Sequence, residues 1–233
     1  MKRLLEKRLS CSYGLRCHWF LAIAIGFFLA GPLQPHAETL EAGGLSFSDE
    51  LGGFRLISAT GSGRETDPIV LVEEFLGMGP AVLTIRRSSQ ADAGPPSNSV
   101  LQRSLLKVVI NRSALRWSGF DLELRSDRGK ASVYGDGLSF DQIRMIATPL
   151  HSDLFAKVRT EDEPYDRLRF DQGRVKPEQA VRLAFNLVDI NPRPVFYLAQ
   201  QPIVLLADAA RRRSDVAAGL LLRQAMRSDR TGR

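Results

Sequence analysis

Hydrophobic and polar residues alternate along much of the chain beyond residue 37, and this alternation predicts β-strands. Between Val181 and Val188 every second residue is large and apolar, the period of a strand with one buried face. Phe120–Arg125 alternates in the same way. Further runs rich in β-branched, apolar or aromatic residues are Phe54–Ala59, Ile69–Leu76, Ala81–Arg86, Leu105–Asn111, Ala131–Tyr134, Phe155–Thr160, Arg167–Phe170 and Val195–Gln200.

Short turns separate many of these runs. Segments rich in Gly, Pro, Asp or Asn occur at residues 77–80, 127–129, 135–137, 171–173 and 191–194. Because such turns are too short to hold a crossover helix, neighbouring strands should be mostly antiparallel. We therefore predict an all-β fold, an antiparallel β-sandwich, in a single domain over residues 38–210. A partly open β-barrel is the alternative architecture.

Two regions interrupt the strand pattern. Residues 87–100 include a run of Ser, Ala, Gly, Pro and Asn with almost nothing to bury, which predicts a long flexible loop within the domain. Residues 211–233 combine apolar positions at helical spacing with several arginines, which predicts a short basic helix from about Arg211 to Met226 and a tail. A capping-box pattern at Ser139 predicts another short helix reaching about Ala147.

The N-terminal segment has the layout of an export signal. Basic residues lead into an uninterrupted apolar run of 12 residues, Trp19–Ala30, which Gly31 and Pro32 follow. That run is shorter than the roughly 20 residues that a membrane-spanning helix needs. We therefore expect residues 1–37 to form a removable signal peptide and the protein to be exported, with the periplasm as its destination. An uncleaved leader that tethers the protein to a membrane is the alternative.

Removal of this leader changes the chemistry available to the protein. The leader holds five of the 32 lysines and arginines and one of the 26 acidic residues, so 27 basic and 25 acidic residues remain. This near balance argues against nucleic-acid binding, which needs clustered cations. Both cysteines and two of the three histidines also lie in the leader, which leaves His151 in a loop-like segment. We therefore expect no zinc site and no cofactor.

Two adjacent glutamates, Glu73 and Glu74, are the first candidate site. If residues 77–80 form a hairpin loop, Glu73 lies diagonal to Arg86 on the next strand. Both faces of the first strand are otherwise apolar, so one of the two carboxylates must lie among apolar neighbours. Such surroundings raise the pKa of a carboxyl group and suit general acid or base catalysis. The structural alternative, which we favour, is an ion pair between Glu73 and Arg86, with Glu74 facing solvent.

An acidic segment is the second candidate site. Its members, Glu161, Asp162, Glu163, Asp166 and Asp171, could supply several of the about six to eight oxygen ligands that calcium takes. Arginines nearby in the sequence are close enough to neutralise these acids. We therefore favour a solvated, partly ion-paired loop over a calcium site, and keep Asp162 and Asp166 as ligand-binding candidates.

Trp117 is the only tryptophan beyond the leader. Its flat ring, near Gly119 at the start of a strand, is suited to stacking on a sugar or anchoring a partner. A tryptophan in such a place more commonly closes the end of a sandwich core, so burial is the competing interpretation.

Few side chains suited to catalysis remain beyond the leader. This favours a non-catalytic, exported β-sandwich that binds or scaffolds an envelope component, either a protein or a glycan. The alternatives are an envelope enzyme that acts on glycans through carboxylates and a calcium-stabilised binding module. Membrane contact is expected only through an uncleaved leader or, weakly, through the basic C-terminal tail.

Overall fold

The computed structural model describes residues 37–88, 100–133, 135–141, 146, 149–161, 164–191 and 193–205. These residues form β-strands and no helix, so the all-β prediction is confirmed for them. The strands are β1 (Thr39–Ala42), β2 (Leu45–Ser48), β3 (Arg55–Thr60), β4 (Ile69–Phe75), β5 (Ala81–Arg87), β6 (Leu101–Asn111), β7 (Trp117–Asp127), β8 (Lys130–Ala131), β9 (Leu138–Ser139), β10 (His151–Ser152), β11 (Phe155–Glu161), β12 (Arg167–Gly173), β13 (Ala180–Asp189) and β14 (Val195–Val204).

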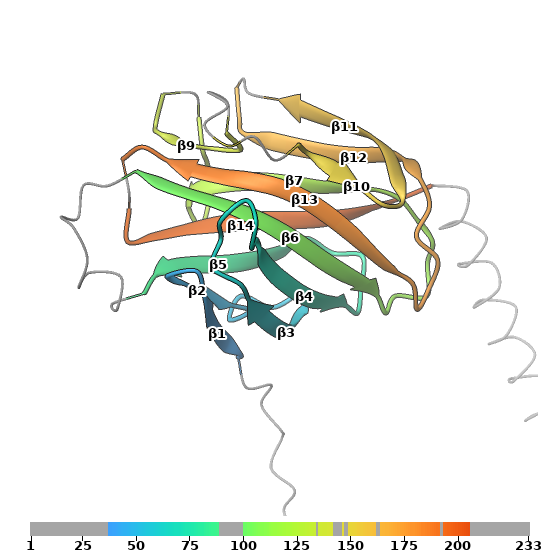
Figure 1. The fold of residues 1–233 in the computed structure, drawn as a ribbon. Helices are drawn as coiled ribbons and strands as arrows, with labels where there is room; N and C mark the ends of the chain where they lie inside the picture. Colours follow the sequence, from blue (N-terminus) through green and yellow to red (C-terminus); the bar gives the residue numbers. More distant parts are fainter. Residues whose placement is uncertain are drawn as a thin grey trace, which may run out of the picture. The chain divides into compact units, whose positions relative to one another are not determined.

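The strands form two sheets (Figure 1). In sheet A they follow the order β1-β2-β5-β14-β7-β12-β11, with β8 also paired to β7. Sheet B has the order β10-β13-β6-β4-β3, with β9 also paired to β13. The described strand pairs are antiparallel except β4 and β6, which run parallel. The prediction of mostly antiparallel neighbours is therefore confirmed.

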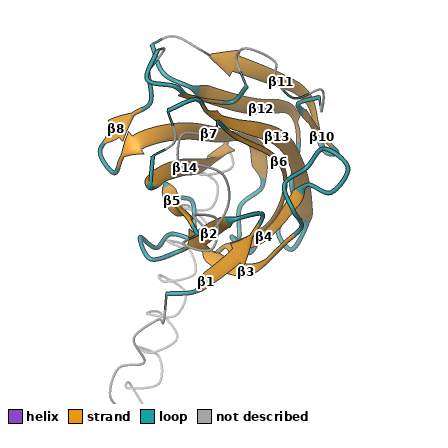
Figure 2. Cartoon of the chain, turned by 60° about the vertical axis from the view of Figure 1, so that its left-hand side comes forward, coloured by secondary structure: helices purple, strands orange, loops and turns teal. Residues whose placement is uncertain are grey.

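The edges of the two sheets approach each other on both sides of the core. β1 contacts β3 at one side, and the short β10 leads directly into β11 at the other. Figure 2 shows how the strands curve around a common interior. The two sheets remain separately hydrogen-bonded, so the fold is consistent with a β-sandwich.

The predicted hairpin between Ile69–Leu76 and Ala81–Arg86 is wrong. β4 lies in sheet B between β3 and β6, whereas β5 lies in sheet A between β2 and β14. Residues 76–80 therefore cross from one sheet to the other. One face of β4 is buried in the core, and the residues on its other face, which include Val70 and Val72, are half-buried. The excursion of the chain through β5 also gives β4 and β6 the long connection that parallel strands require.

The inward-facing side chains of both sheets form one apolar core. Aromatic rings gather around Phe75, which stacks on Phe54 with ring centroids 5.8 Å apart. Trp117 and Phe120 meet Phe75 edge-on, at 6.0 and 5.4 Å. Such contacts add about 0.5–1.5 kcal/mol each beyond the burial of apolar area. This cluster joins strand β4 of sheet B to strand β7 of sheet A, so it holds the two layers together.

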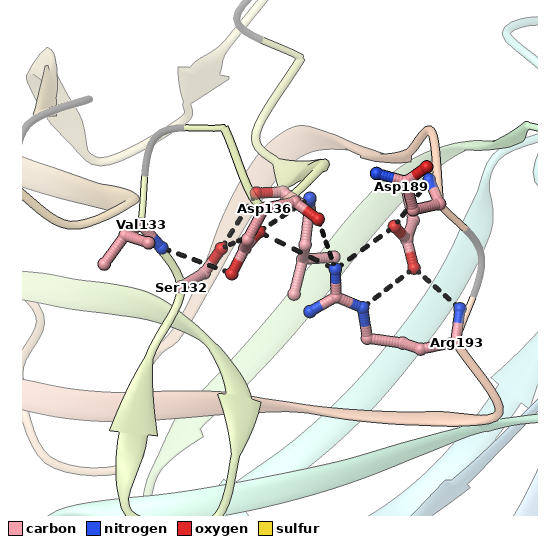
Figure 3. A network of polar contacts seen from close by, with 7 residues as sticks. Ser132, Val133, Asp136, Asp189 and Arg193 are labelled. Atoms are coloured by element: carbon pink, nitrogen blue, oxygen red, sulfur yellow. Dashed lines mark hydrogen bonds and ion pairs between the residues drawn. The ribbon is translucent and has the colours of Figure 1, made fainter.

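A network of polar contacts ties the turn before β14 to the loop before β9 (Figure 3). The Arg193 Nε lies 3.2 Å from Asp189 Oδ2, and its Nη2 donates to the backbone carbonyl of Asp136 at 2.8 Å. The Asp136 carboxylate in turn accepts hydrogen bonds from the Ser132 hydroxyl and the Val133 N–H. Because Asp189 is completely buried, Arg193 compensates a charge that would otherwise stand alone inside the protein.

Several predicted features lie outside the described residues. These are the signal peptide, most of the loop and the C-terminal helix, at residues 1–36, 89–99 and 206–233. Most of the helix predicted from Ser139 to Ala147 also lies outside them, and Ser139 itself belongs to strand β9. Within the described part of the chain, no helix has the length and hydropathy to cross a membrane.

Candidate functional site

Glu73 and Lys107 form a buried ion pair between neighbouring strands of sheet B. Alternate residues of β4 point into the core, and Glu73 takes one of these positions. On the parallel neighbour β6, Lys107 also points inward. Lys107 Nζ donates to Glu73 Oε1, and both side chains are fully excluded from solvent. The inward residues that flank them on the two strands are apolar and buried: Leu71, Phe75, Leu105 and Val109.

Burial opposes the charged form of both groups. Removal from water raises the pKa of Glu73 above its ordinary value, while the adjacent Lys107 works against the shift. The same desolvation lowers the pKa of Lys107, and the charge of Glu73 opposes this change. From sheet A, the amide of Gln200 on β14 lies beside the Glu73 carboxyl and also acts to lower its pKa. Glu73, Lys107 and Gln200 thus form a buried polar triad to which both sheets contribute.

The buried polar triad keeps unused hydrogen-bonding capacity. Glu73 Oε2 and both polar atoms of the Gln200 amide are buried, with no hydrogen bond of normal geometry to the described protein groups. Fully buried polar atoms are nearly always hydrogen-bonded, since each unmet bond costs free energy. The triad is therefore an expensive feature of the protein interior.

Arg86 is not the partner of Glu73, so that part of the prediction is wrong. The physical reason is that β4 and β5 belong to different sheets. Glu74 points to the outer face of sheet B, where Arg55 and Arg112 pair with its carboxylate at 3.4 and 2.8 Å. Glu73 and Glu74 therefore lie on opposite faces of one sheet and do not form the facing pair of carboxylates that a glycosidase needs.

The outer face of sheet A carries a ladder of ion pairs across β7 and β12. Arg169 donates two hydrogen bonds to Asp121, at 2.8 and 2.7 Å, and this contact raises the pKa of Arg169. One step along the strands, Arg167 donates to Glu123 at 2.6 Å. Arg125 occupies the other oxygen of Glu123 at 2.8 Å. Each of these guanidinium groups is held in place by a carboxylate, which fixes its orientation.

A pocket of about 230 Å³ opens on this ladder. We call it the sheet A pocket. It is lined by residues of β7, β12 and β14, including the ladder residues and Gln201, and by Glu161 and Pro80. The lining carries three carboxylates and three guanidinium groups, so it has no net charge. Tyr165, which is 39% exposed, lies next to it, because the Arg167 guanidinium sits 5.1 Å from the centre of its ring.

The acidic segment is dispersed among several environments. Glu161 is exposed at the end of β11, Asp166 is buried, and Asp171 pairs with Arg159 at 2.9 Å. Two further members, Asp162 and Glu163, lie outside the described residues. Among the residues that the structure describes, no three His, Cys, Asp or Glu side chains are grouped so as to hold a metal ion. A calcium site at this segment stays a prediction.

Trp117 lies in the core and has no exposed ring face. Its Nε1 donates to the Ser113 hydroxyl at 3.2 Å, which satisfies the one polar atom of the ring. The side chain thus offers no surface on which a sugar can stack. His151 is exposed on β10, with its Nδ1 3.1 Å from the Pro149 carbonyl oxygen.

Comparison of this chain with protein-family models, with curated proteins and with solved structures gives no significant match. Function must therefore be inferred from the two polar arrangements themselves. Sequence reasoning missed most of their members, including Lys107, Gln200 and the ladder on β7 and β12.

Proposed function

We propose that the protein is an exported, non-catalytic β-sandwich that binds a sugar chain of the cell envelope in the sheet A pocket. The observation that carries the proposal is the set of planar polar groups that line this pocket, of which the ion-paired ladder residues are held at fixed positions. Carboxylates, guanidinium groups and the Gln201 amide are able to accept from and donate to neighbouring hydroxyls in pairs. The exposed ring of Tyr165 adds an apolar face beside them.

The size and charge of the pocket favour a sugar over the other envelope partners. A protein partner buries about 800 Å² on each side of a flat interface, and a small pocket is not needed for that. The volume of this pocket, about 230 Å³, lies below the roughly 300–1,000 Å³ of sites that hold drug-sized ligands. It therefore suits one short unit of a longer chain. Its lack of net charge fits a neutral or zwitterionic unit better than a polyanion.

The proposed function is non-catalytic because of where the carboxyl groups lie. Glu73, whose pKa burial raises, is sealed inside the core and is not accessible to a substrate. Asp121 and Glu123, two of the three carboxylates that line the sheet A pocket, are paired with Arg169 and Arg167. Such groups suit recognition of a ligand more than proton transfer to it.

Binding of cello-, malto- and chito-oligosaccharides to pocket variants tests this function. Gln201→Ala and Tyr165→Ala leave the ion pairs of the ladder intact and should each weaken binding of the preferred sugar about tenfold, a loss of ~1.4 kcal/mol. Thr60→Ala, at an exposed position on β3 in the other sheet, is the matched control and should bind like the unchanged protein. Equal binding by all variants, or no binding to sugars or isolated envelope polysaccharide, would overturn the proposal.

A further inference from the structure

The buried polar triad places an amine against a carboxyl group in the interior of the protein. Lys107 Nζ touches Glu73 Oε1, and neither side chain has any exposed surface. β4 and β6 are hydrogen-bonded neighbours along their whole common length, so the backbone holds the two groups in contact. Groups that a scaffold holds together reach effective concentrations of up to about 10⁵–10⁸ M when the reacting atoms are well oriented.

The apolar surroundings favour the pair of neutral groups from which an amide forms. A free amine and a carboxylic acid arise from the ion pair by transfer of one proton from Lys107 to Glu73. Desolvation pushes the two pKa values toward each other, since it raises that of Glu73 and lowers that of Lys107. In water the hydration of the separate ions opposes condensation, but these buried ions have lost that hydration.

We propose that Lys107 and Glu73 become joined by an amide bond once the chain has folded. The Lys107 amine attacks Glu73 Cδ, a bond forms between Nζ and Cδ, and the bond from Cδ to one carboxyl oxygen breaks. That oxygen leaves as water with two protons, one from the carboxylic acid and one from the attacking nitrogen. No oxidant, reductant or co-reactant takes part, and two buried charges are replaced by one neutral amide.

Gln200 is the positioning residue for this reaction. Its amide lies beside the Glu73 carboxyl, and its polar atoms have no other hydrogen-bond partner in the described part of the chain. An amide N–H directed at the carboxyl oxygen would polarise the carbon and stabilise negative charge on oxygen during the attack. This role gives a reason for a buried glutamine on the opposite sheet, where an apolar residue would otherwise pack.

The bond would link strands that are distant in sequence. Glu73 and Lys107 are separated by β5 and by the segment that leads to β6. A covalent link across this loop lowers the entropy of the unfolded chain, as a disulfide does. The chain beyond the leader has no cysteine, so an amide is a cross-link that remains available to it in an oxidising compartment. The inference is independent of sugar binding at the sheet A pocket.

Mass spectrometry of the purified, denatured protein tests the proposal. We expect a mass lower than that of the same chain by one water, once the N-terminus has been determined from its terminal peptide. Trypsin should no longer cleave after Lys107, because its side chain is acylated. The digest should therefore contain a branched peptide in which residues 65–86 are joined to residues 104–112.

Variants and a chemical control show which residues lose the water. Lys107→Arg should restore the full mass, and Glu73→Gln should abolish the loss of water, because any bond formed by a glutamine releases ammonia. Gln200→Ala should lower the cross-linked fraction at a given time after folding. Cyclisation at Asp136-Gly137 also releases water, but its product opens in mild base, whereas the amide persists.

The mass and the tryptic digest of the unchanged protein test the proposal even if a variant fails to fold. A full sequence mass together with normal cleavage after Lys107 would overturn the proposal. So would a loss of water that maps to other residues, or a loss of ammonia that maps to a bond between Lys107 and Gln200.

Discussion

Glu73 and Lys107 occupy inward positions on β4 and β6, and the inward residues that directly flank them are apolar. Before any amide forms, the attraction between the two buried charges offsets the cost of desolvation only in part, so the ion pair itself contributes little net stability. Removing one partner is different, because the other is then left unpaired in the core. Single substitutions at this site should therefore destabilise the protein much more than a matched double substitution.

We expect Lys107→Met to lower the free energy of unfolding by about 3–5 kcal/mol, since it leaves Glu73 buried without a partner. The double variant Lys107→Met, Glu73→Leu should recover part of this loss, because no buried ionisable group remains. Chemical denaturation of the three proteins measures the differences. If the double variant is as unstable as the single one, lost packing or the lost cross-link explains the effect, and the unpaired carboxyl does not.

The stabilising effect of a more exposed ion pair, Glu50–Arg86, should depend on pH. Arg86 donates to Glu50 at 2.6 Å, and this hydrogen bond lowers the pKa of Glu50 below its ordinary value of 4.5. The carboxylate is therefore favoured in the folded state, so its contribution is present above about pH 4.5 and disappears as the pH falls through the lowered pKa. Glu50→Gln should lower stability by about 0.2–1 kcal/mol at pH 7, because the pair is partly exposed.

Unfolding curves at a series of pH values check this prediction. The gap between Glu50→Gln and the unchanged protein should close in acid. A gap that stays constant down to the acid end of the series would show that the pKa of Glu50 does not differ between the folded and unfolded states.

Sequence alone predicts part of the buried site. Apolar residues on both faces of β4 require one of its two glutamates to lie among apolar neighbours, and Glu73 does. The partner was not predictable, because Leu106 and Val108 on the other face of β6 are as apolar as the inward residues. Nothing in that strand therefore indicated which way Lys107 points.

At the scale of elements, strand pairing depends on contacts that short-range patterns do not encode. The alternating runs predicted most of the longer strands, but β1 and β2 were missed because each has only four residues. The short turn after β4 suggested a hairpin with β5, yet β4 pairs with β3 and β6 within sheet B. Local turn chemistry was overridden by the packing of the whole sheet.

The pairing between the start of β11 and the end of β12 depends on a glycine. A Cβ added at Gly173 would lie 1.9 Å from the backbone oxygen of Leu154, so the two segments would have to separate. We expect Gly173→Ala to reduce the free energy of unfolding by about 1–3 kcal/mol. Gly77→Ala is the matched control, because a Cβ there meets nothing within 4 Å. Thermal unfolding that ranks the two variants equally would contradict this role of Gly173.

The polar network of Figure 3 joins two loops at one end of the fold. We expect Arg193→Ala to cost about 3 kcal/mol, because it leaves the buried carboxylate of Asp189 without its cation. Arg182→Ala removes an ion pair with Asp153 in which the two side chains are 62% and 34% exposed, and should change stability by less than ~1 kcal/mol. Denaturant titration of both variants tests the contrast, and similar losses would refute the role given to burial.

At the scale of the whole domain, alternation along the chain was sufficient to predict two layers of strands around one core. It was not sufficient to find the sheet A pocket, because the charges that line it come from strands brought together by their order in the sheet. Asp121 and Glu123 look like ordinary solvent-facing residues of an alternating strand. Only their register opposite Arg169 and Arg167 turns them into a fixed array.

Chemical-shift mapping by NMR tests the central claim, which is recognition of a sugar chain on the outer face of sheet A. During titration with the oligosaccharide that binds best, backbone amides of β7, β12 and β14 around Asp121, Arg169 and Gln201 should shift, while those of β3 and β4 stay in place. Shifts confined to sheet B, or none at saturating oligosaccharide and envelope polysaccharide, would contradict the account.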